Sequence, residues 1–250
     1  MESDGDWMRH LERMTVFAEQ RRQHIGELTE LAKKHCYIRI GGNGFRLVSI
    51  HRDNPCGSLY IDGKEVGTTP TLSVVLDKAQ FASQRVGSPG NGKTEHRVQA
   101  YLIQQALTRP EEFPGLLDCD DLFDELLFIT DEFRLGEIRA DVIALGRKGE
   151  SYVPVYIELK ATRSLTRVID QLDNITNRMT TASNAAVALL AAASGIGAEL
   201  IEMNPRRLLI WPANASGRES AAVSNARDKG FVTIGYTKPS EFEFGFQRER

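Results

Sequence analysis

The chain has 250 residues and a formal net charge of −3 at pH 7, with 41% hydrophobic and 26% charged residues. These proportions are ordinary for a globular protein and exclude a chain that is basic throughout. They do not exclude a local basic patch, because an acidic active site lowers the total charge. The three cysteines, Cys36, Cys56 and Cys119, form neither a CxxC pair nor a disulfide framework. We therefore expect a reducing compartment and no zinc site.

The ends and the apolar stretches of the sequence predict a cytoplasmic location. Residues 1–13 are polar and charged, so we expect no secretory signal. The most apolar stretch, Ala185 to Ala193, is nine residues long, whereas a helix needs roughly 20 to span a bilayer. It is expected to be a buried helix, and no membrane partner is expected.

Residues 7–34 are predicted to form one long amphipathic helix. Its apolar positions recur at a spacing of three and four, with Arg21 as an interruption. This stripe has two interpretations: the helix packs on its own domain, or it pairs with another subunit and makes a homo-oligomer. The stripe consists of Trp7, Leu11, Met14, Phe17, Ala18, Ile25, Leu28, Leu31 and Ala32.

Residues 36–76 change to a pattern of short strands, in YIRI, FRLVSI and SLYIDGKEVG. The segment GGNG and the pair Asp62-Gly63 supply hairpin turns that need positive φ. We interpret residues 1–85 as an accessory N-terminal domain, a long helix with a small β-sheet. The segment GSPGNG, 87–92, is the expected linker, and 93–250 is the second domain.

The second domain is predicted to be α/β, with a mixed central sheet flanked by helices. A helix begins near Lys93, with Thr94 as a plausible N-cap. Three strands follow, then two helices, a strand, a helix and a last strand. The expected ranges after the first helix are 125–133, 137–146, 152–160, 164–179, 183–201, 207–212, 218–229 and 231–236.

Three polar residues in the predicted strands form a candidate active site. Side chains alternate along a strand, so Glu158 and Lys160 share the face of YVPVYIELK opposite its core face. Asp141 lies in the preceding strand, where a turn brings it beside Glu158. Two carboxylates can bind Mg²⁺, which lowers the pKa of a bound water. The lysine can orient that water or stabilise charge on phosphorus.

Asp141 followed by Glu158-Leu159-Lys160, in a hairpin with a helix after it, resembles the PD-(D/E)XK nuclease superfamily. The resemblance covers roughly 93–211 and implies an αβββαβ restriction-endonuclease-like core. It also implies a Mg²⁺-dependent phosphodiesterase, for which Mn²⁺ can substitute. DNA is the expected substrate, cut as an endonuclease, and bacterial DNA defence or restriction is the expected setting by analogy.

The resemblance also assigns further residues. Glu95 on the first helix matches an additional acidic residue of the family, as a metal ligand or a support. The backbone carbonyl of Leu159 is an expected metal ligand beside Asp141 and Glu158. Gln171 matches a glutamine that some branches place on the helix after the motif. The chain departs from the family at Ala140, where proline is common, and at Ile175, where those branches have tyrosine.

Basic residues near the motif are candidates for contacts to nucleic-acid phosphates. Arg139 precedes Asp141 by two residues on the same strand face, and the others follow Lys160. Solvated helix charges explain each arginine equally well when it is taken singly. The expected nucleic-acid-binding residues are Arg139, Arg163, Arg167 and Arg178.

Two alternatives remain open. GSPGNGKT, 87–94, fits the phosphate-binding loop G-x-x-x-x-G-K-[ST], with Lys93 for phosphate and Thr94 for Mg²⁺. Asp131 would then be the metal-binding acid of a nucleotide hydrolase. The preceding AQFASQRV is too polar for the buried strand that such a loop follows. The other alternative is a non-catalytic nucleic-acid- or protein-binding module on a nuclease fold.

Overall fold

A computed structural model gives the fold, and several expected features lie outside the part that it describes. The predicted Asp62-Gly63 hairpin, the linker 87–92 and the loop 87–93 before Thr94 all fall there, and so does the domain boundary. Each of these stays a prediction. The described residues are 4–42, 44–50, 72, 94–135, 138–165, 167–214, 221–238 and 243–249.

A six-stranded mixed sheet forms the centre of the protein, in the order β3-β4-β5-β6-β7-β8. β3, β4 and β5 form an antiparallel meander, β6 is parallel to β5, β7 is parallel to β6, and β8 is antiparallel to β7. The predicted mixed α/β class is therefore confirmed. The strands are β3 (Glu125–Leu135), β4 (Ile138–Lys148), β5 (Ser151–Leu159), β6 (Arg206–Pro212), β7 (Phe231–Thr237) and β8 (Gly245–Arg248).

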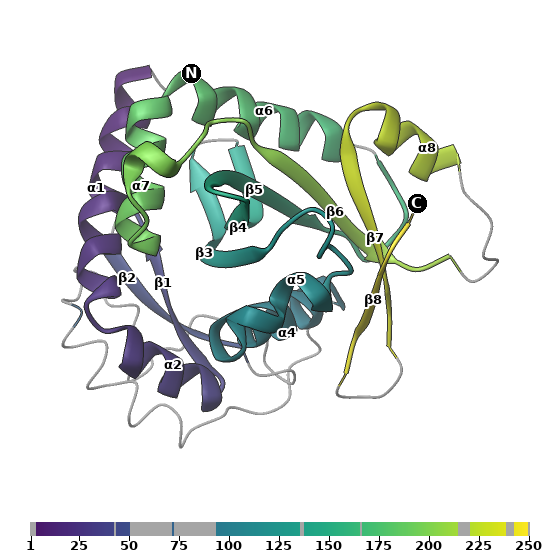
Figure 1. Ribbon diagram of the computed structural model, residues 1–250, viewed down its shortest axis with the longest axis horizontal. Coiled ribbons are helices and arrows are strands. Elements are labelled where there is room, and N and C mark those ends of the chain that lie inside the picture. The colour runs from purple at the N-terminus through teal and green to yellow at the C-terminus, as the bar shows by residue number, and fades with distance from the viewer. Residues whose placement is uncertain are drawn as a thin grey trace.

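Helices cover both faces of this sheet (Figure 1). One face packs on α4 (Thr94–Thr108), the short 3₁₀ turn η1 (Pro110–Glu112) and α5 (Phe113–Leu116). The other packs on α6 (Val168–Thr181), α7 (Ser183–Ser194) and α8 (Ala221–Asp228). This two-sided cover explains why β5 reads as a nearly continuous apolar run. Among the described helices, none is both long and apolar enough to cross a membrane.

The prediction of one helix over 7–34 is wrong, because the chain bends after Arg22. Two helices form instead, α1 (Asp4–Arg22) and α2 (Ile25–Lys33). α1 lies beside α7 (Figure 1), whereas α2 packs on α4. A straight helix could not reach both partners, and Ile25, at the bend, is 60% exposed.

The stripe of α1 is buried within its own chain, in one cluster with residues of α6, α7 and the sheet. The stripe is therefore covered within the same chain, chiefly by α7 of the region predicted as the second domain, and not only by residues 1–85. Self-association through another surface stays a prediction. The buried members of the stripe in α1 are Trp7, Leu11, Met14 and Ala18.

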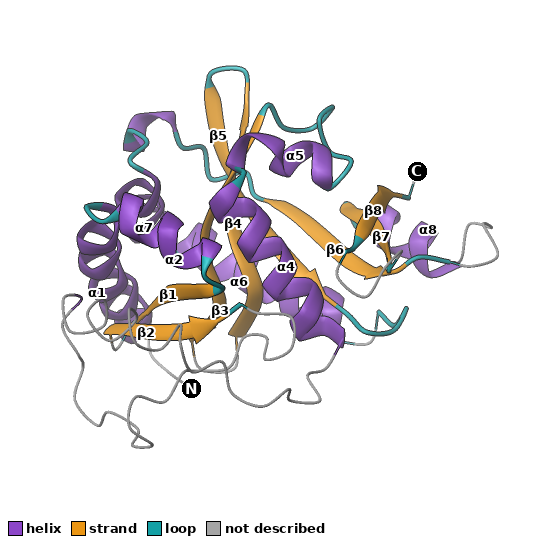
Figure 2. Cartoon of the chain, turned by 90° about the horizontal axis from the view of Figure 1, so that it is seen from below, coloured by secondary structure: helices purple, strands orange, loops and turns teal. Residues whose placement is uncertain are grey.

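The hairpin of β1 (Cys36–Gly41) and β2 (Gly44–Ser49) lies against the outer edge of the sheet (Figure 2). At that edge β3 has a bulge at Ile129, where the register with β4 shifts by one residue. Arg21 is buried and donates to the Ile129 carbonyl at 2.6 Å, and also to Tyr37 Oη and the Ile38 carbonyl. The arginine that interrupts the stripe thus satisfies carbonyls that the strands leave open.

Two helix boundaries and one strand also differ from the sequence prediction. The helix expected over 164–179 begins at Val168, because Arg167 has a left-handed φ of 65°. The helix expected over 183–201 ends at Ser194, where Gly195 adopts the positive φ typical of a helix end. β8 was not predicted, since its four residues carry little periodicity.

Because α1 belongs to the core, Leu11→Ala is expected to lower the free energy of unfolding by about 2–5 kcal/mol through loss of apolar contact and a residual cavity. Leu11 is fully buried. Val16→Ala on the same helix removes a side chain from a residue that is 51% exposed, and should change stability by less than about 0.5 kcal/mol. Urea unfolding of both variants measures the difference, and equal effects would show that α1 is not packed as described.

Candidate active site at the ends of β4 and β5

Asp141 and Glu158 lie on adjacent antiparallel strands. Val142 of β4 pairs with Ile157 of β5, and Asp141, just before Val142, and Glu158, just after Ile157, lie at the same end of this ladder. Val155, Ile157 and Leu159 point into the core under α4. Glu158 takes the opposite face, as the alternation along the strand predicts.

Glu158 is 1% exposed, and two neighbouring side chains hold its carboxylate. Lys160 Nζ donates to Oε1 at 2.6 Å, and Gln171 Nε2, from α6, donates to Oε2 at 2.8 Å. The same Gln171 amide lies 3.4 Å from the carbonyl of Arg139. Gln171 therefore links the helix after the motif to both strands.

Asp141 is tied to the backbone of β5. The Leu159 N–H donates to Asp141 Oδ2 at 2.7 Å. Because Leu159 lies between Glu158 and Lys160, this hydrogen bond places the Asp141 carboxylate beside the Glu158-Leu159-Lys160 segment. The three residues singled out from the sequence are thus brought together.

Glu95 reaches the same strand end from the first turn of α4. The Ala161 N–H, directly after Lys160, donates to Glu95 Oε1 at 2.7 Å. The carboxylate is close enough to act electrostatically on both Glu158 and Lys160. Its contact here is with backbone, so it supports the turn that follows the motif.

Burial and mutual repulsion make the two carboxylates hold protons more tightly than usual. Burial, followed by the charge of Glu158, raises the pKa of Asp141 from 3.8 to about 8. Burial also raises the pKa of Glu158, against the lowering effect of Lys160. For Lys160, burial opposes the charge, but Glu158 and Asp141 outweigh it and raise the pKa of the ammonium. The lysine therefore stays charged at neutral pH. Its single positive charge does not balance the two neighbouring carboxylates when both are ionised.

The donor set fits a hard divalent cation. Carboxylate and carbonyl oxygens from Asp141, Glu158 and Leu159 are the ligands that Mg²⁺ prefers, and water completes its shell. Each Glu158 oxygen keeps a lone pair beyond its present hydrogen bond. Among the described residues, no group of three or more His, Cys, Asp or Glu side chains is close enough to hold a metal. Protein side chains here would thus supply only part of a coordination shell.

Three further residues adjoin this site that sequence reasoning did not assign to it: Gln99, Asp131 and Arg39. Gln99 of α4 is buried and donates to the Asp141 carbonyl at 3.1 Å. It also lies 3.3 Å from Asp131 Oδ2, whose carboxylate binds Arg39 through two bonds. The spacing Glu95–Gln99, four residues on one helix, places both on one face and is the signal that could have found Gln99.

The predicted nucleic-acid-binding arginines lie in different environments. Arg163 is engaged within the chain, by Glu249 at 2.6 Å, by the Pro212 carbonyl and over the Trp211 ring. Arg178 lies over the ring of Trp7. Arg139 and Arg167 are exposed. A contact to phosphate stays a prediction for each, and Arg139 and Arg167 have the accessibility that it needs.

The structure gives the rival acid, Asp131, a different environment from the one a nucleotide hydrolase needs. Its side chain is fully buried and ion-paired with Arg39. β3, which carries it, is an edge strand antiparallel to its neighbour β4. A metal-bound nucleotide would have to displace Arg39 to reach this carboxylate.

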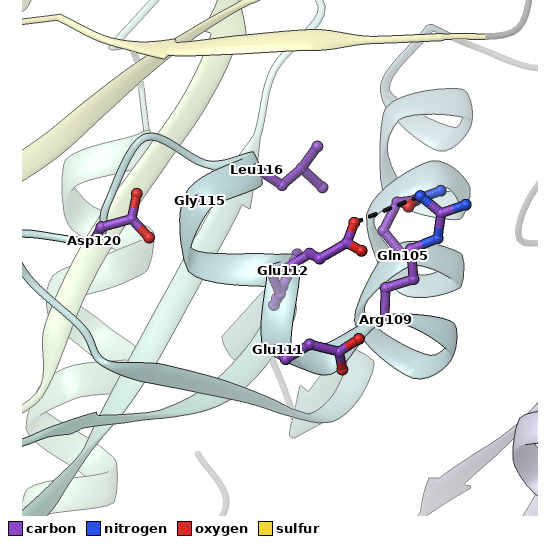
Figure 3. A pocket seen from close by; sticks show the side chains of 8 residues that line it. Gln105, Arg109, Glu111, Glu112, Gly115, Leu116 and Asp120 are labelled. Carbon is purple, nitrogen blue, oxygen red and sulfur yellow. Dashed lines mark hydrogen bonds and ion pairs between the residues drawn. The ribbon is translucent and has the colours of Figure 1, made fainter.

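A separate hollow of about 440 Å³ lies where α4 ends and α5 begins (Figure 3). Glu111, Glu112 and Asp120 line it, and Arg109 pairs with Glu112 across it. It shares no lining residue with the site at Asp141 and Glu158. We assign it no role in the chemistry.

Comparison with protein-family models, with characterised proteins and with solved structures finds no match to this chain.

The raised pKa of Asp141 predicts how stability depends on pH in divalent-free buffer. Between about pH 4 and pH 8 the folded state keeps a proton that the unfolded chain has lost. The free energy of unfolding should therefore fall as the pH rises through this window. Asp141→Asn should flatten the dependence, whereas Asp170→Asn, on the exposed face of α6, should leave it unchanged. Denaturant titrations at a series of pH values measure this, and an unaltered slope in Asp141→Asn would contradict the assignment.

Proposed function

We propose that this chain is a metal-dependent nuclease that hydrolyses phosphodiester bonds, with Asp141, Glu158 and Lys160 as its catalytic residues. The observation that carries the proposal is one constellation: the buried carboxylate of Glu158, the half-buried carboxylate of Asp141 beside it, and a charged lysine hydrogen-bonded to Glu158. Two carboxylates and a lysine serve both cation binding and the stabilisation of charge on a phosphate.

The order of elements supports the same proposal. α4 is followed by the antiparallel meander β3-β4-β5, then by α6, and β6 pairs parallel to β5. This is the αβββαβ order that the resemblance to PD-(D/E)XK nucleases implies. Glu95 and Gln171, the two residues taken from that resemblance alone, both contact the strand end that carries the motif.

Asp141, Glu158 and the Leu159 carbonyl are the proposed ligands of a Mg²⁺ ion. When bound, the ion supplies a water of lowered pKa and a positive charge beside the phosphate. The cation also offsets the repulsion between Asp141 and Glu158, so we expect the carboxylates to bind it in their charged forms.

The other residues have roles that follow from their contacts. Lys160 keeps its proton at neutral pH and can donate a hydrogen bond to a non-bridging phosphate oxygen or to the attacking water. Gln171 holds Glu158 from α6, which fixes the carboxylate plane. Glu95 holds the turn at Ala161. DNA is the substrate we propose, with DNA defence or restriction as the setting by analogy.

Single substitutions test the catalytic assignment. Asp141→Asn, Glu158→Gln and Lys160→Met should each lower plasmid cleavage about a hundredfold or more, because each removes several kcal/mol of transition-state stabilisation. Glu150→Gln, in the exposed turn between β4 and β5, is the matched control and should cleave normally. Cleavage should stop in excess EDTA and return with Mg²⁺ or Mn²⁺.

Thermal melts of each variant separate loss of chemistry from loss of fold. Full cleavage by Asp141→Asn and Glu158→Gln would falsify the nuclease proposal. If Lys93→Ala alone is inactive and the protein turns over ATP, the phosphate-binding-loop alternative replaces it. Metal-independent DNA binding without cleavage would favour the non-catalytic module.

Two arginines near the motif should behave differently when replaced by alanine. Arg167 is exposed, so Arg167→Ala should weaken DNA binding across sequences and reduce the salt dependence of affinity by about one phosphate contact. Arg163 is held by Glu249 and Trp211, so Arg163→Ala should lower the melting temperature and leave the affinity for DNA nearly unchanged. Fluorescence anisotropy at several salt concentrations, with melts of both variants, measures this. Equal effects of the two substitutions on affinity would argue against the distinction.

A further inference from the structure

A network of polar side chains connects the N-terminal hairpin to the backbone of Asp141. Arg39, on β1, donates to both oxygens of Asp131, on β3, through its Nε and Nη2 atoms. Gln99, on α4, donates to Asp131 Oδ2 at 3.3 Å and to the Asp141 carbonyl at 3.1 Å. β1 and β3 are thus linked through Gln99 of α4 to the backbone of Asp141.

This network is largely buried. The Asp131 side chain is fully buried, Gln99 is 2% exposed and the Arg39 side chain is 13% exposed. A buried carboxylate in a bidentate pair with an arginine has little freedom to reorient, because any other orientation leaves a buried charge unpaired. Gln99 is therefore held between a fixed carboxylate and the β4 backbone.

The Asp141 carbonyl lies at an irregular point of the sheet. Glu132 lies opposite Asp141, between the pairs Asp131–Val142 and Phe133–Ala140, and has a φ of 45°. A left-handed residue other than glycine distorts a strand locally. Glu132 Oε1 lies 3.5 Å from the same Gln99 amide. The hydrogen bond from Gln99 thus holds the Asp141 backbone at a point where the neighbouring strand is irregular.

We infer that Gln99 is a positioning residue for Asp141, held in place by the Arg39–Asp131 pair. The hairpin β1–β2 is then part of the support of the active site. Partners that orient the ligands of a metal typically change metal affinity or activity by about 10- to 100-fold when they are lost. The inference rests on the proposed function for its kinetic readout, but its binding readout needs only the cation.

The test compares two glutamines of α4. Gln99→Met keeps the volume of the side chain and removes its donor to Asp141. Gln104→Met is the matched control, because Gln104 pairs with His35 Nδ1 at 2.8 Å and so also contacts the N-terminal region, but not β4. Calorimetric titration with Mn²⁺ should show an affinity about 10-fold or more weaker for Gln99→Met and unchanged for Gln104→Met. Plasmid cleavage by Gln99→Met should show a lowered kcat with an unchanged KM for DNA.

Arg39→Lys provides a second test that keeps a positive charge beside Asp131. It removes the bidentate hydrogen bonding to Asp131, so Mn²⁺ affinity should fall, as in Gln99→Met. This variant decides the question if Gln99→Met does not fold. The inference is overturned if a folded Gln99→Met binds Mn²⁺ as tightly as Gln104→Met does. If Gln99→Met does not fold, the same comparison is made with Arg39→Lys. If the wild-type chain itself binds no Mn²⁺ and cuts no DNA, the proposed function fails instead, and the two failures are distinct.

Discussion

Two carboxylates placed side by side, one of them almost completely shielded from water, are the constraint to which the rest of the site responds. Glu158 is nearly inaccessible, and Asp141 lies beside it, with its carboxylate accepting from the Leu159 N–H. Each would lose much of its hydration on folding, and the two charges repel, so hydrogen-bond donors must surround them. The donors come from one backbone N–H, one lysine and one glutamine. Each element that supplies one of these donors is thereby held in place relative to Asp141 and Glu158.

Other contacts connect regions that the sequence suggested were separate. α1 shares a hydrophobic cluster with α6 and α7, the helices that cover the Glu158 face. β1 supplies Arg39 to the buried Asp131 of β3. The described part of residues 1–85 therefore contributes both apolar and polar contacts to the sheet that carries the site. This explains why a helix with a long apolar stripe needs no second subunit to cover it.

Features of short range could be predicted from the sequence, and features of long range could not. Alternation of period two placed Glu158 and Lys160 on one face of β5, and a tight turn at Gly149 placed Asp141 beside them. By contrast, Arg39 and Asp131 are 92 residues apart, and Arg163 and Glu249 are 86 apart. Local periodicity contains no information about such pairs. Glu95 was found only through the family resemblance, because nothing in its own helix marks it as part of the site.

The bulge at Ile129 has a consequence for how this protein behaves at high concentration. β3 is the outer strand of the six-stranded sheet, and an outer strand with open carbonyls can recruit a strand from another molecule. The Arg21 guanidinium donates a hydrogen bond to the Ile129 carbonyl, which is then not available to another strand. The bulge also disturbs the flat edge that such pairing needs. One buried arginine on the N-terminal helix therefore does more than link α1 to the sheet. Together with the β1–β2 hairpin, which lies against the same edge, it leaves β3 less open to pairing with a strand of another molecule.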